Sequence, residues 1–283
     1  MQALKNVWAE VRAQFGARGA LLARLAAVLA YYALYACSRA AGRSQDDARV
    51  RALFALNHRL GLARRVVEVR LRDGSRLALD LMSAAFFIKE FQEDRMYEAF
   101  PEFVPGIGQT VIDVGGHQGL FTVPAARRVG PSGRVLAVEP APANRALLER
   151  NVAANGLKNV AVAAEAASDA PGSAALHDSK LSTSYSLVFR EEESSSQSVP
   201  TRTLDEIASS LGVSRADLIK IDVEGAALKV LAGSSALLAL RPRLVMEVEG
   251  TDADRGAVAR FLDARGFAVR ESRGILYAEA RRT

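Results

Sequence analysis

Short apolar runs alternate with helical patterns along the chain from residue 110 onward. The runs are rich in Val, Ile and Leu and too short for helices, which is typical of buried parallel strands. We expect strands at 110–114, 134–139, 160–164, 218–223 and 244–249, helices at 119–129, 143–154, 205–211, 226–240 (interrupted near Gly233) and 252–265, and a closing pair of strands around Gly274. This alternation predicts an α/β fold with a mostly parallel, Rossmann-like sheet covered by helices on both faces.

The chain before this core shows two other patterns. Residues 1–65 carry apolar positions at helical spacing and predict a helical extension, with one amphipathic helix and one largely apolar helix. Residues 66–105 begin with apolar and polar residues alternating around Asp73-Gly74, which predicts a β-hairpin with a two-residue turn. The stretch RMYEAF, at 95–100, is expected to be helical, so that 66–105 forms a cap before a core domain at 106–283.

The charge of the chain is concentrated at its N-terminal end. The net charge is +5, whereas residues 1–65 carry eleven Lys or Arg against three acidic residues. A basic segment favours an anionic surface such as a membrane or a nucleic acid. Residues 19–37 are long enough to span a bilayer, but Arg24 within them costs about 2.5–3.5 kcal/mol on insertion scales. We therefore expect helices docked on protein, or peripheral membrane contact through residues 1–40, rather than a span.

Cys37 is the single cysteine of the chain. It excludes a disulfide within the chain and indicates a reducing, cytoplasmic environment.

A glycine-rich stretch, VIDVGGHQGLFT at 111–122, joins the first core strand to its helix. Gly115, Gly116 and Gly119 let the backbone turn and approach a ligand, and the following helix points its free N–H groups at that ligand. This arrangement occurs in dinucleotide sites and in S-adenosylmethionine sites. We expect His117, inside the loop, to pack near the ligand.

Two acidic residues bear on these alternatives, and one of them distinguishes between them. Asp113 lies within the first core strand, where it would accept hydrogen bonds from an ammonium group but repel a pyrophosphate. Glu139 ends the second strand, where a carboxylate accepts from both ribose hydroxyls of a nucleoside. Glu139 fits either kind of site, whereas Asp113, together with a glycine spacing that is not G-x-G-x-x-G, favours S-adenosylmethionine over a nicotinamide cofactor, and a methyltransferase over an oxidoreductase.

A second polar cluster lies in DLIKIDVEGAALKVLAG, at 217–233. Lys220, Asp222 and Glu224 alternate with apolar residues, so strand periodicity places the three charges on one side. Lys220 can pair with a neighbouring carboxylate, as buried charges require. Asp222 would emerge at the carboxyl end of its strand, and Glu247 would end the next strand at the same edge of the sheet.

Several motifs in a fixed order make residues 95–250 resemble the FkbM family of S-adenosylmethionine-dependent methyltransferases. They are MYE (96–98), VIDVGGHQGLFT, VLAVEPAPANRALLERNVAANG, AASD (166–169), TLDE (203–206), IKIDVEGAALKVLAG and VMEVEG. The resemblance implies a class I methyltransferase sheet with an antiparallel last strand, and it implies that Ala166 lies at the adenine end of the cofactor. The chain departs from the family at His117, where Asn is usual, and at Ala227, where Glu is frequent.

The expected function is methyl transfer from S-adenosylmethionine to a hydroxyl of a sugar or another small molecule. Asp222 is the first candidate for orienting or deprotonating that hydroxyl, and Glu224 and Glu247 are further candidates. The expected cofactor contacts are Asp113, Gly115, Gly116, His117, Gly119, Glu139, Ala166 and Asp222. No metal site is predicted, because the sequence shows no clear ligand triad, although the same acids are an alternative site for a divalent ion.

Two other functions remain open from the sequence. An RNA methyltransferase would explain the basic N-terminal segment, but no nucleic-acid-binding module is recognisable there, so no nucleic acid partner is expected. A scaffold with an inactive cofactor fold would be tethered by its N-terminal helices. The serine-rich stretch at 180–198 is either a lid over the acceptor or a solvated loop.

Overall fold

A computed structural model describes residues 66–80, 83–84, 95–178, 185–186 and 196–281. The helices predicted within residues 1–65, the peripheral contact through 1–40 and most of the stretch 180–198 lie outside these residues. The chain divides into two compact units, and the larger contains Arg70–Leu77, Glu90–Lys180 and Ser184–Thr283. Within the described ranges, no helix has the length and apolar character needed to span a membrane.

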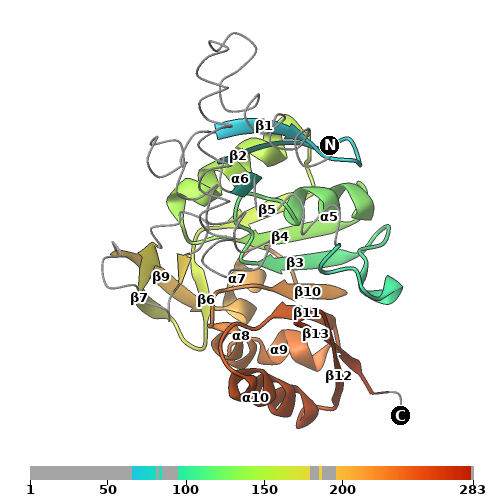
Figure 1. Cartoon of the computed structure of the whole chain (residues 1–283), viewed down its shortest axis with the longest axis vertical. Helices are drawn as coiled ribbons and strands as arrows, with labels where there is room; N and C mark the ends of the chain where they lie inside the picture. The colour runs from blue at the N-terminus through green and yellow to red at the C-terminus, as the bar shows by residue number, and fades with distance from the viewer. Residues whose placement is uncertain (1–65, 81–82, 85–94, 179–184, 187–195, 282–283) are drawn as a thin grey trace, which may run out of the picture. The chain divides into compact units, whose positions relative to one another are not determined.

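The larger unit is built on a seven-stranded sheet with the order β12-β13-β11-β10-β3-β4-β5 (Figure 1). Strands β11, β10, β3, β4 and β5 run parallel, whereas β13 is antiparallel to both of its neighbours. This confirms the predicted Rossmann-like sheet with an antiparallel last strand. The strands span Thr110–Val114 (β3), Arg134–Val138 (β4), Val160–Ala163 (β5), Leu218–Ile221 (β10), Arg243–Glu247 (β11), Phe267–Ser272 (β12) and Ile275–Ala280 (β13).

The chain enters this sheet in the middle and runs outward in two directions. It passes from β3 to β5 and then returns to β10, on the other side of β3. The order of strands therefore reverses between β3 and β10, and ligands of open α/β sheets bind at the carboxyl ends of the strands beside such a point.

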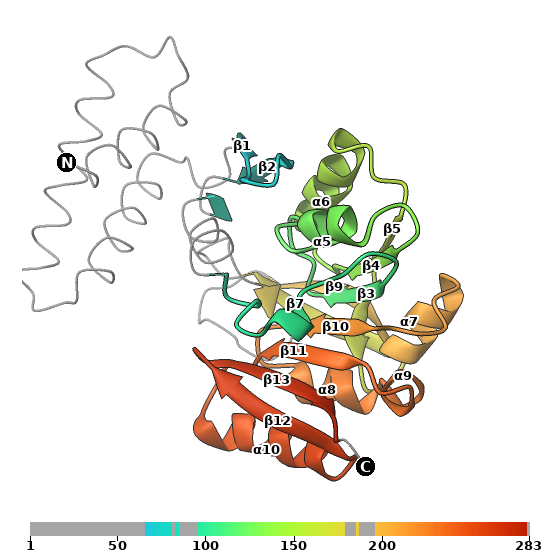
Figure 2. The ribbon, with the colours of Figure 1, turned by 90° about the vertical axis from the view of Figure 1, so that its right-hand side faces the viewer.

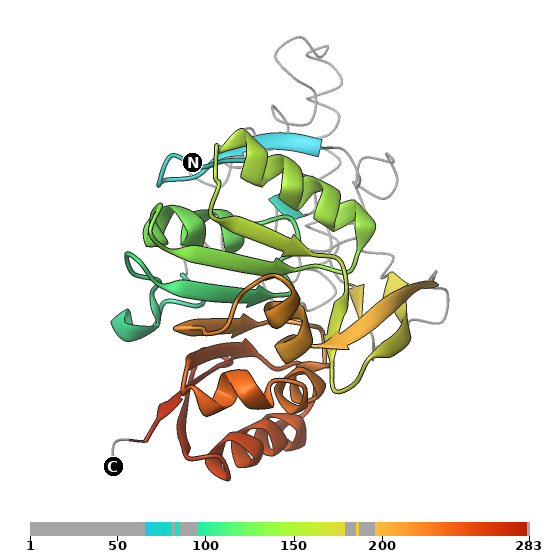
Figure 3. The same ribbon diagram turned by 180° about the vertical axis from the view of Figure 1, so that it is seen from behind.

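Helices cover both faces of the sheet, as the apolar runs predict (Figures 2 and 3). Val111, Val135, Leu218 and Val245 pack with residues of α5 (Thr122–Val129) on one face. The apolar residues that alternate with these along each strand face the other way. They belong to a second cluster, formed with α7 (Leu204–Ser210), α8 (Ala227–Ala232), α9 (Ser235–Ala239) and α10 (Asp252–Asp263). Because side chains alternate along a strand, Asp113 and Lys220 fall on the α5 face.

The TLDE motif holds helices together. Thr203 caps α7 by accepting from the Glu206 N–H (3.2 Å). Asp205 accepts from the backbone N–H groups of Ala236 (2.7 Å) and Leu237 (2.9 Å) at the start of α9. The geometry of this motif therefore assigns it a structural role.

The apolar patterns predict no strand between residues 165 and 200, but the described residues there form strands. A second sheet has the order β6-β9-β7-β8, with β6 at Ala166–Ser168, β7 at Gly172–Asp178, β8 at Tyr185–Ser186 and β9 at Ser196–Thr203. Most side chains of β9 are exposed or half-buried. Strand β9 therefore lacks the apolar run that reveals the strands of the main sheet, and its backbone pairing with β6 and β7 defines it.

The predicted hairpin is confirmed, but the prediction of a two-residue turn was wrong. Strands β1 (Val66–Arg70) and β2 (Arg76–Asp80) form a two-stranded sheet. Leu71 N–H donates to the Ser75 carbonyl (2.8 Å), and Gly74, with a φ of 86°, donates to the Leu71 carbonyl (3.0 Å). This pattern makes a three-residue turn that ends in a left-handed glycine. The Asp73 carboxylate favours it by accepting from the Ser75 N–H and hydroxyl (2.9 Å each).

The helix predicted at 95–100 is absent from this described part of the chain. These residues form a turn, and a short 3-10 helix, η2 (Pro101–Phe103), follows them. The Tyr277 hydroxyl on β13 donates to the Met96 carbonyl (2.8 Å). Its ring meets the rings of Phe100 and Phe103 edge-on. Tertiary contacts thus replace the helical hydrogen bonds in this segment.

The longer helix α6 (Pro142–Ala154) follows β4 and completes the elements around the site. Its Leu148 is fully buried against the glycine-rich loop. The loop is thus enclosed between β3, α5 and α6.

Candidate active site

A buried lysine lies at the centre of the site. Lys220 and Asp113 are direct partners in the register of β10 and β3. Lys220 Nζ lies 3.1 Å from Asp113 Oδ1 and 3.5 Å from Asp222 Oδ2, and it donates to the Gly115 carbonyl (2.7 Å). Burial by itself would lower the pKa of Lys220, but the two carboxylates outweigh burial and raise it. The expected pairing of Lys220 is therefore confirmed, with two acids rather than one.

Asp113 is enclosed by this network. Its side chain is 0% exposed, and its Oδ2 accepts from the Thr122 hydroxyl (2.5 Å). Burial raises the pKa of Asp113, although Lys220 and Thr122 oppose that rise. The carboxylate fixes β3 to α5 and to Lys220, and its predicted contact with the cofactor stays a prediction.

Backbone packing explains the first glycine of the loop. Gly115 has a φ of 81°, and a Cβ at this position would lie 1.8 Å from the Asp222 carbonyl oxygen. Gly115 and Gly116 both donate to the Val138 carbonyl (3.0 Å each), and a Cβ on Gly119 would lie 3.0 Å from Leu148. The glycines allow the loop to pass between Asp222 and α6, which accounts for them before any ligand is considered.

His117 adopts a left-handed backbone conformation with a φ of 48°. Asn and His are enriched among the non-glycine residues that tolerate this region. The departure from the family at His117 therefore preserves the backbone geometry that the loop requires.

Glu139 lies beside this loop, at the carboxyl end of β4. The residue is 5% exposed, and its carboxylate accepts from the backbone N–H groups of His117 (2.7 Å) and Ala141 (2.9 Å). Burial raises the pKa of Glu139 to about 7 against the effect of these two donors. Each carboxylate oxygen keeps one further acceptor position. A buried carboxylate of this kind fits a ligand that brings hydroxyl donors, such as the ribose of a nucleoside.

Ala166 lies near the same end of the sheet. It is the first residue of β6 and packs in a buried cluster with Ala141, Leu176 and Val199. Ala141 is also the residue whose N–H binds Glu139. The expected adenine contact of Ala166 stays a prediction, and its place near Glu139 is compatible with it.

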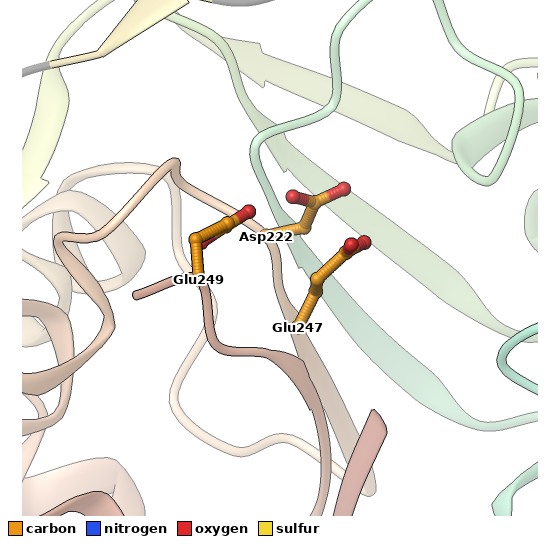
Figure 4. Close-up of side chains that lie close together, drawn as sticks. All are labelled: Asp222, Glu247 and Glu249. Atoms are coloured by element: carbon orange, nitrogen blue, oxygen red, sulfur yellow. The ribbon is translucent and has the colours of Figure 1, made fainter. Parts of the chain in front are cut away.

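Asp222 emerges directly after β10, as predicted. Its N–H donates to the Val114 carbonyl (3.0 Å), and its side chain is 27% exposed. Oxygens of Asp222, Glu247 and Glu249 lie within 4.8 Å of one another (Figure 4). This spacing allows the three acids to hold one divalent cation or to surround one hydroxyl group.

Tyr97 joins two of these acids. Its hydroxyl, on a side chain that is 3% exposed, lies 2.9 Å from Asp222 Oδ2 and 3.2 Å from Glu247 Oε2. Burial and the neighbouring carboxylates raise the pKa of Tyr97 well above its usual value, so the hydroxyl stays a proton donor. The predicted place of Glu247 at the same edge as Asp222 is thereby confirmed.

Glu224 does not share a strand face with Asp222. Strand β10 ends at Ile221, and Glu224 lies in the following turn with a φ of 48°. The charge of Glu224 is one reason, after burial and Asp222, why the pKa of Glu249 is raised to about 8. Glu224 therefore lies next to the acidic cluster and affects the pKa of Glu249 through its charge.

Sequence reasoning missed Tyr97 and Glu249. Glu249 follows β11, and its carboxylate accepts from the Gly225 N–H (2.9 Å), which ties the turn after β10 to the end of β11. The one sequence signal for Glu249 is its position two residues after Glu247, because residues two apart in a strand share a face. Tyr97 belongs to the MYE motif, but the helix expected there gave it no place in the site.

Comparisons of the sequence with known proteins identify its relatives. A family model for the methyltransferase FkbM domain matches residues 113–269, more than half of the chain. Methyltransferase 1 of Beauveria bassiana is 26% identical over 211 residues, which cover 66% of this chain and 82% of that protein. Methyltransferase sdnD of Sordaria araneosa is 26% identical over 228 residues, which cover 69% of this chain and 86% of that protein.

Solved structures give a more distant likeness. The FkbM methyltransferase of Methylobacillus flagellatus is 16% identical with a TM-score of 0.45, over 89% of this chain and 58% of that one. A methyltransferase of Aquifex aeolicus is 16% identical with a TM-score of 0.43, over 71% of this chain and 97% of that one. The family match rests on sequence, and on that basis the chain belongs to the FkbM family of S-adenosylmethionine-dependent methyltransferases.

Proposed function

We propose that this methyltransferase acts on a hydroxyl group of a sugar or another small molecule, and that Asp222 takes the proton of that hydroxyl. S-adenosylmethionine supplies an electrophilic methyl group when it is bound. Glu139 and the loop from Gly115 to Gly119 would hold it. The observation that carries the proposal is the position of Asp222. Its backbone carbonyl packs against Gly115, and its carboxylate lies close to those of Glu247 and Glu249.

Proximity is the main contribution expected of these residues. A hydroxyl held in line with a methyl group gains up to about 7–11 kcal/mol from orientation alone. The partly exposed carboxylate of Asp222 is available to an acceptor, whereas Asp113 and Lys220 are enclosed. Asp222 would therefore orient the acceptor and receive its proton, while the methyl carbon would exchange its bond to sulfur for a bond to the acceptor oxygen and S-adenosylhomocysteine would leave.

The acidic cluster favours an acceptor without negative charge. Asp222 and Glu247 repel phosphate and carboxylate groups. The pKa of Glu249, raised to about 8 by burial, Asp222 and Glu224, gives its carboxyl a proton to donate near neutral pH. A polyol offers both the acceptor and the donor oxygens that such a cluster binds. Repulsion of the phosphate groups of RNA by the same acids argues against an RNA methyltransferase.

The experiment compares acceptors and variants in one transfer assay. Purified full-length chain is incubated with S-[methyl-3H]adenosylmethionine and a panel of methyl glycosides, simple phenols and total RNA. We expect label in a glycoside or phenol and none in RNA. Asp222→Asn should lower the transfer rate strongly while S-adenosylhomocysteine still binds by calorimetry. Asp263→Asn, an exposed acid on α10, is the matched control and should leave the rate unchanged.

Three outcomes would contradict the proposal. Transfer to RNA alone would favour the nucleic acid alternative. An Asp222→Asn rate within about threefold of wild type would remove Asp222 as the base. Transfer that stops in EDTA and returns with Mg²⁺ would mean that the acids act through a divalent cation.

The basic N-terminal segment belongs to a separate proposal. We infer peripheral membrane contact through residues 1–40 from their charge and apolar spacing. Sedimentation of the full chain with anionic vesicles, compared with a chain that starts at Val66, tests it. Equal binding of both chains would contradict it.

A further inference from the structure

We propose that Tyr97 is a positioning residue that fixes the orientation of the Asp222 carboxylate and so decides which of its oxygens meets the acceptor. This inference rests on the proposed role of Asp222 as the base. Nothing in the sequence patterns singles out Tyr97 for such a role, because 125 residues separate it from Asp222.

The hydroxyl of Tyr97 and the ammonium group of Lys220 both contact the same oxygen of the Asp222 carboxylate. Tyr97 donates to Oδ2 (2.9 Å), and Lys220 Nζ lies 3.5 Å from Oδ2. Within the described residues, no hydrogen bond or ion pair reaches Oδ1. Oδ2 is therefore anchored inside the protein, and Oδ1 is the oxygen left for an acceptor hydroxyl.

The Tyr97 ring is itself held firmly. Its ring meets the Phe121 ring edge-on at 5.9 Å, and Lys220 Nζ lies 5.7 Å from its centroid. The Tyr277 hydroxyl binds the Met96 carbonyl, which fixes the backbone next to Tyr97. A donor supported in this way loses little freedom when it holds a carboxylate.

Tyr97 also links Asp222 to Glu247. Its hydroxyl oxygen lies 2.9 Å from Asp222 Oδ2 and 3.2 Å from Glu247 Oε2, so one hydroxyl serves two carboxylates. The charged groups around it are Asp113 on β3, Lys220 on β10, Asp222 directly after β10, and Glu247 on β11. Without the Tyr97 hydroxyl, the carboxylates of Asp222 and Glu247 would face each other, and Lys220 would be the one cation among these groups. The Asp222 carboxylate would then turn away from the orientation that Tyr97 holds.

The test is a double-mutant cycle between Tyr97 and Asp222. Tyr97→Phe removes one oxygen and keeps the ring. We expect kcat at least about tenfold lower, the loss that corresponds to one hydrogen bond to a charged group, with KM for cofactor and acceptor within about twofold of wild type. In an Asp222→Asn background, Tyr97→Phe should change kcat by less than about twofold, because the carboxylate that it positions is gone.

The assay uses the glycoside or phenol of the panel that wild-type chain methylates fastest, and calorimetry with S-adenosylhomocysteine monitors the fold. A Tyr97→Phe chain that keeps wild-type kcat, that lowers kcat equally in both backgrounds, or that no longer binds S-adenosylhomocysteine would overturn the inference. A wild-type chain that methylates no hydroxyl compound, or an Asp222→Asn chain with full activity, would instead overturn the proposed function on which it rests.

Discussion

Lys220 is the residue whose loss should most disturb the folded site. Lys220→Met keeps much of the side-chain length and removes the charge. It leaves Asp113, which is 0% exposed, without its cation and the Gly115 carbonyl without its 2.7 Å donor. We therefore expect a large loss of stability from a single substitution.

The magnitude follows from the geometry. At 3.1 Å and an effective dielectric constant of about 20, the attraction between Lys220 and Asp113 is about 5 kcal/mol. The cost of burying Lys220 offsets part of it, and removal of one partner of a buried pair typically costs about 3–5 kcal/mol. That is a large part of the roughly 5–15 kcal/mol by which proteins are stable. We expect Lys220→Met to lower the free energy of unfolding by about 3–5 kcal/mol.

Urea unfolding of the full chain, followed by circular dichroism, measures this difference. Lys229→Met is the matched control, because Lys229 is exposed on α8 and should change stability by less than about 0.5 kcal/mol. Adding Asp113→Asn to Lys220→Met should restore part of the loss, since the unpaired charge is then absent. The deficit should also be smaller at pH 5 than at pH 8, because a buried Asp113 whose pKa is raised gains a proton more readily in the folded chain than in the unfolded one.

A deficit below about 1 kcal/mol would refute this reasoning, because it would mean that water or a rearranged side chain compensates the Asp113 charge. No recovery with Asp113→Asn would likewise show that the loss comes from packing rather than from charge.

Two further predictions concern the cofactor site. Burial raises the pKa of Glu139 to about 7, and ribose hydroxyls donate to its charged form, so the affinity for S-adenosylhomocysteine should rise with pH through that value. The increase in affinity between pH 6 and pH 8 should be at most about tenfold by calorimetry. Glu139→Gln should abolish this increase. A wild-type affinity that does not change with pH would contradict the prediction. Gly115→Ala should destabilise the chain by about 3 kcal/mol or more, because its Cβ would lie 1.8 Å from the Asp222 carbonyl oxygen. Gly130→Ala, with a similar left-handed φ of 68° but open space, should cost about 1 kcal/mol, and equal thermal shifts for both variants would count against the steric explanation.

Much of the fold could be read from apolar periodicity. Every predicted strand of the main sheet and the helices between them are present, with ends displaced by a few residues. The pattern works there because both faces of the sheet are buried, so each strand must be apolar. It failed for the second sheet, whose strand β9 is mostly exposed or half-buried, and for residues 95–100, whose backbone is held by Tyr277.

The site divides in the same way. Acids within a strand or directly after it are local features, so the sequence by itself determined the place of Asp113 within β3 and the places of Glu139 and Asp222 directly after β4 and β10. Only the tertiary structure decided that Tyr97 reaches Asp222 and Glu247 across 125 and 150 residues. It also decided that Lys220 lies beside Asp113. Such contacts depend on strand order and register, which arise when distant segments pack together, and periodicity within one segment carries no information about them.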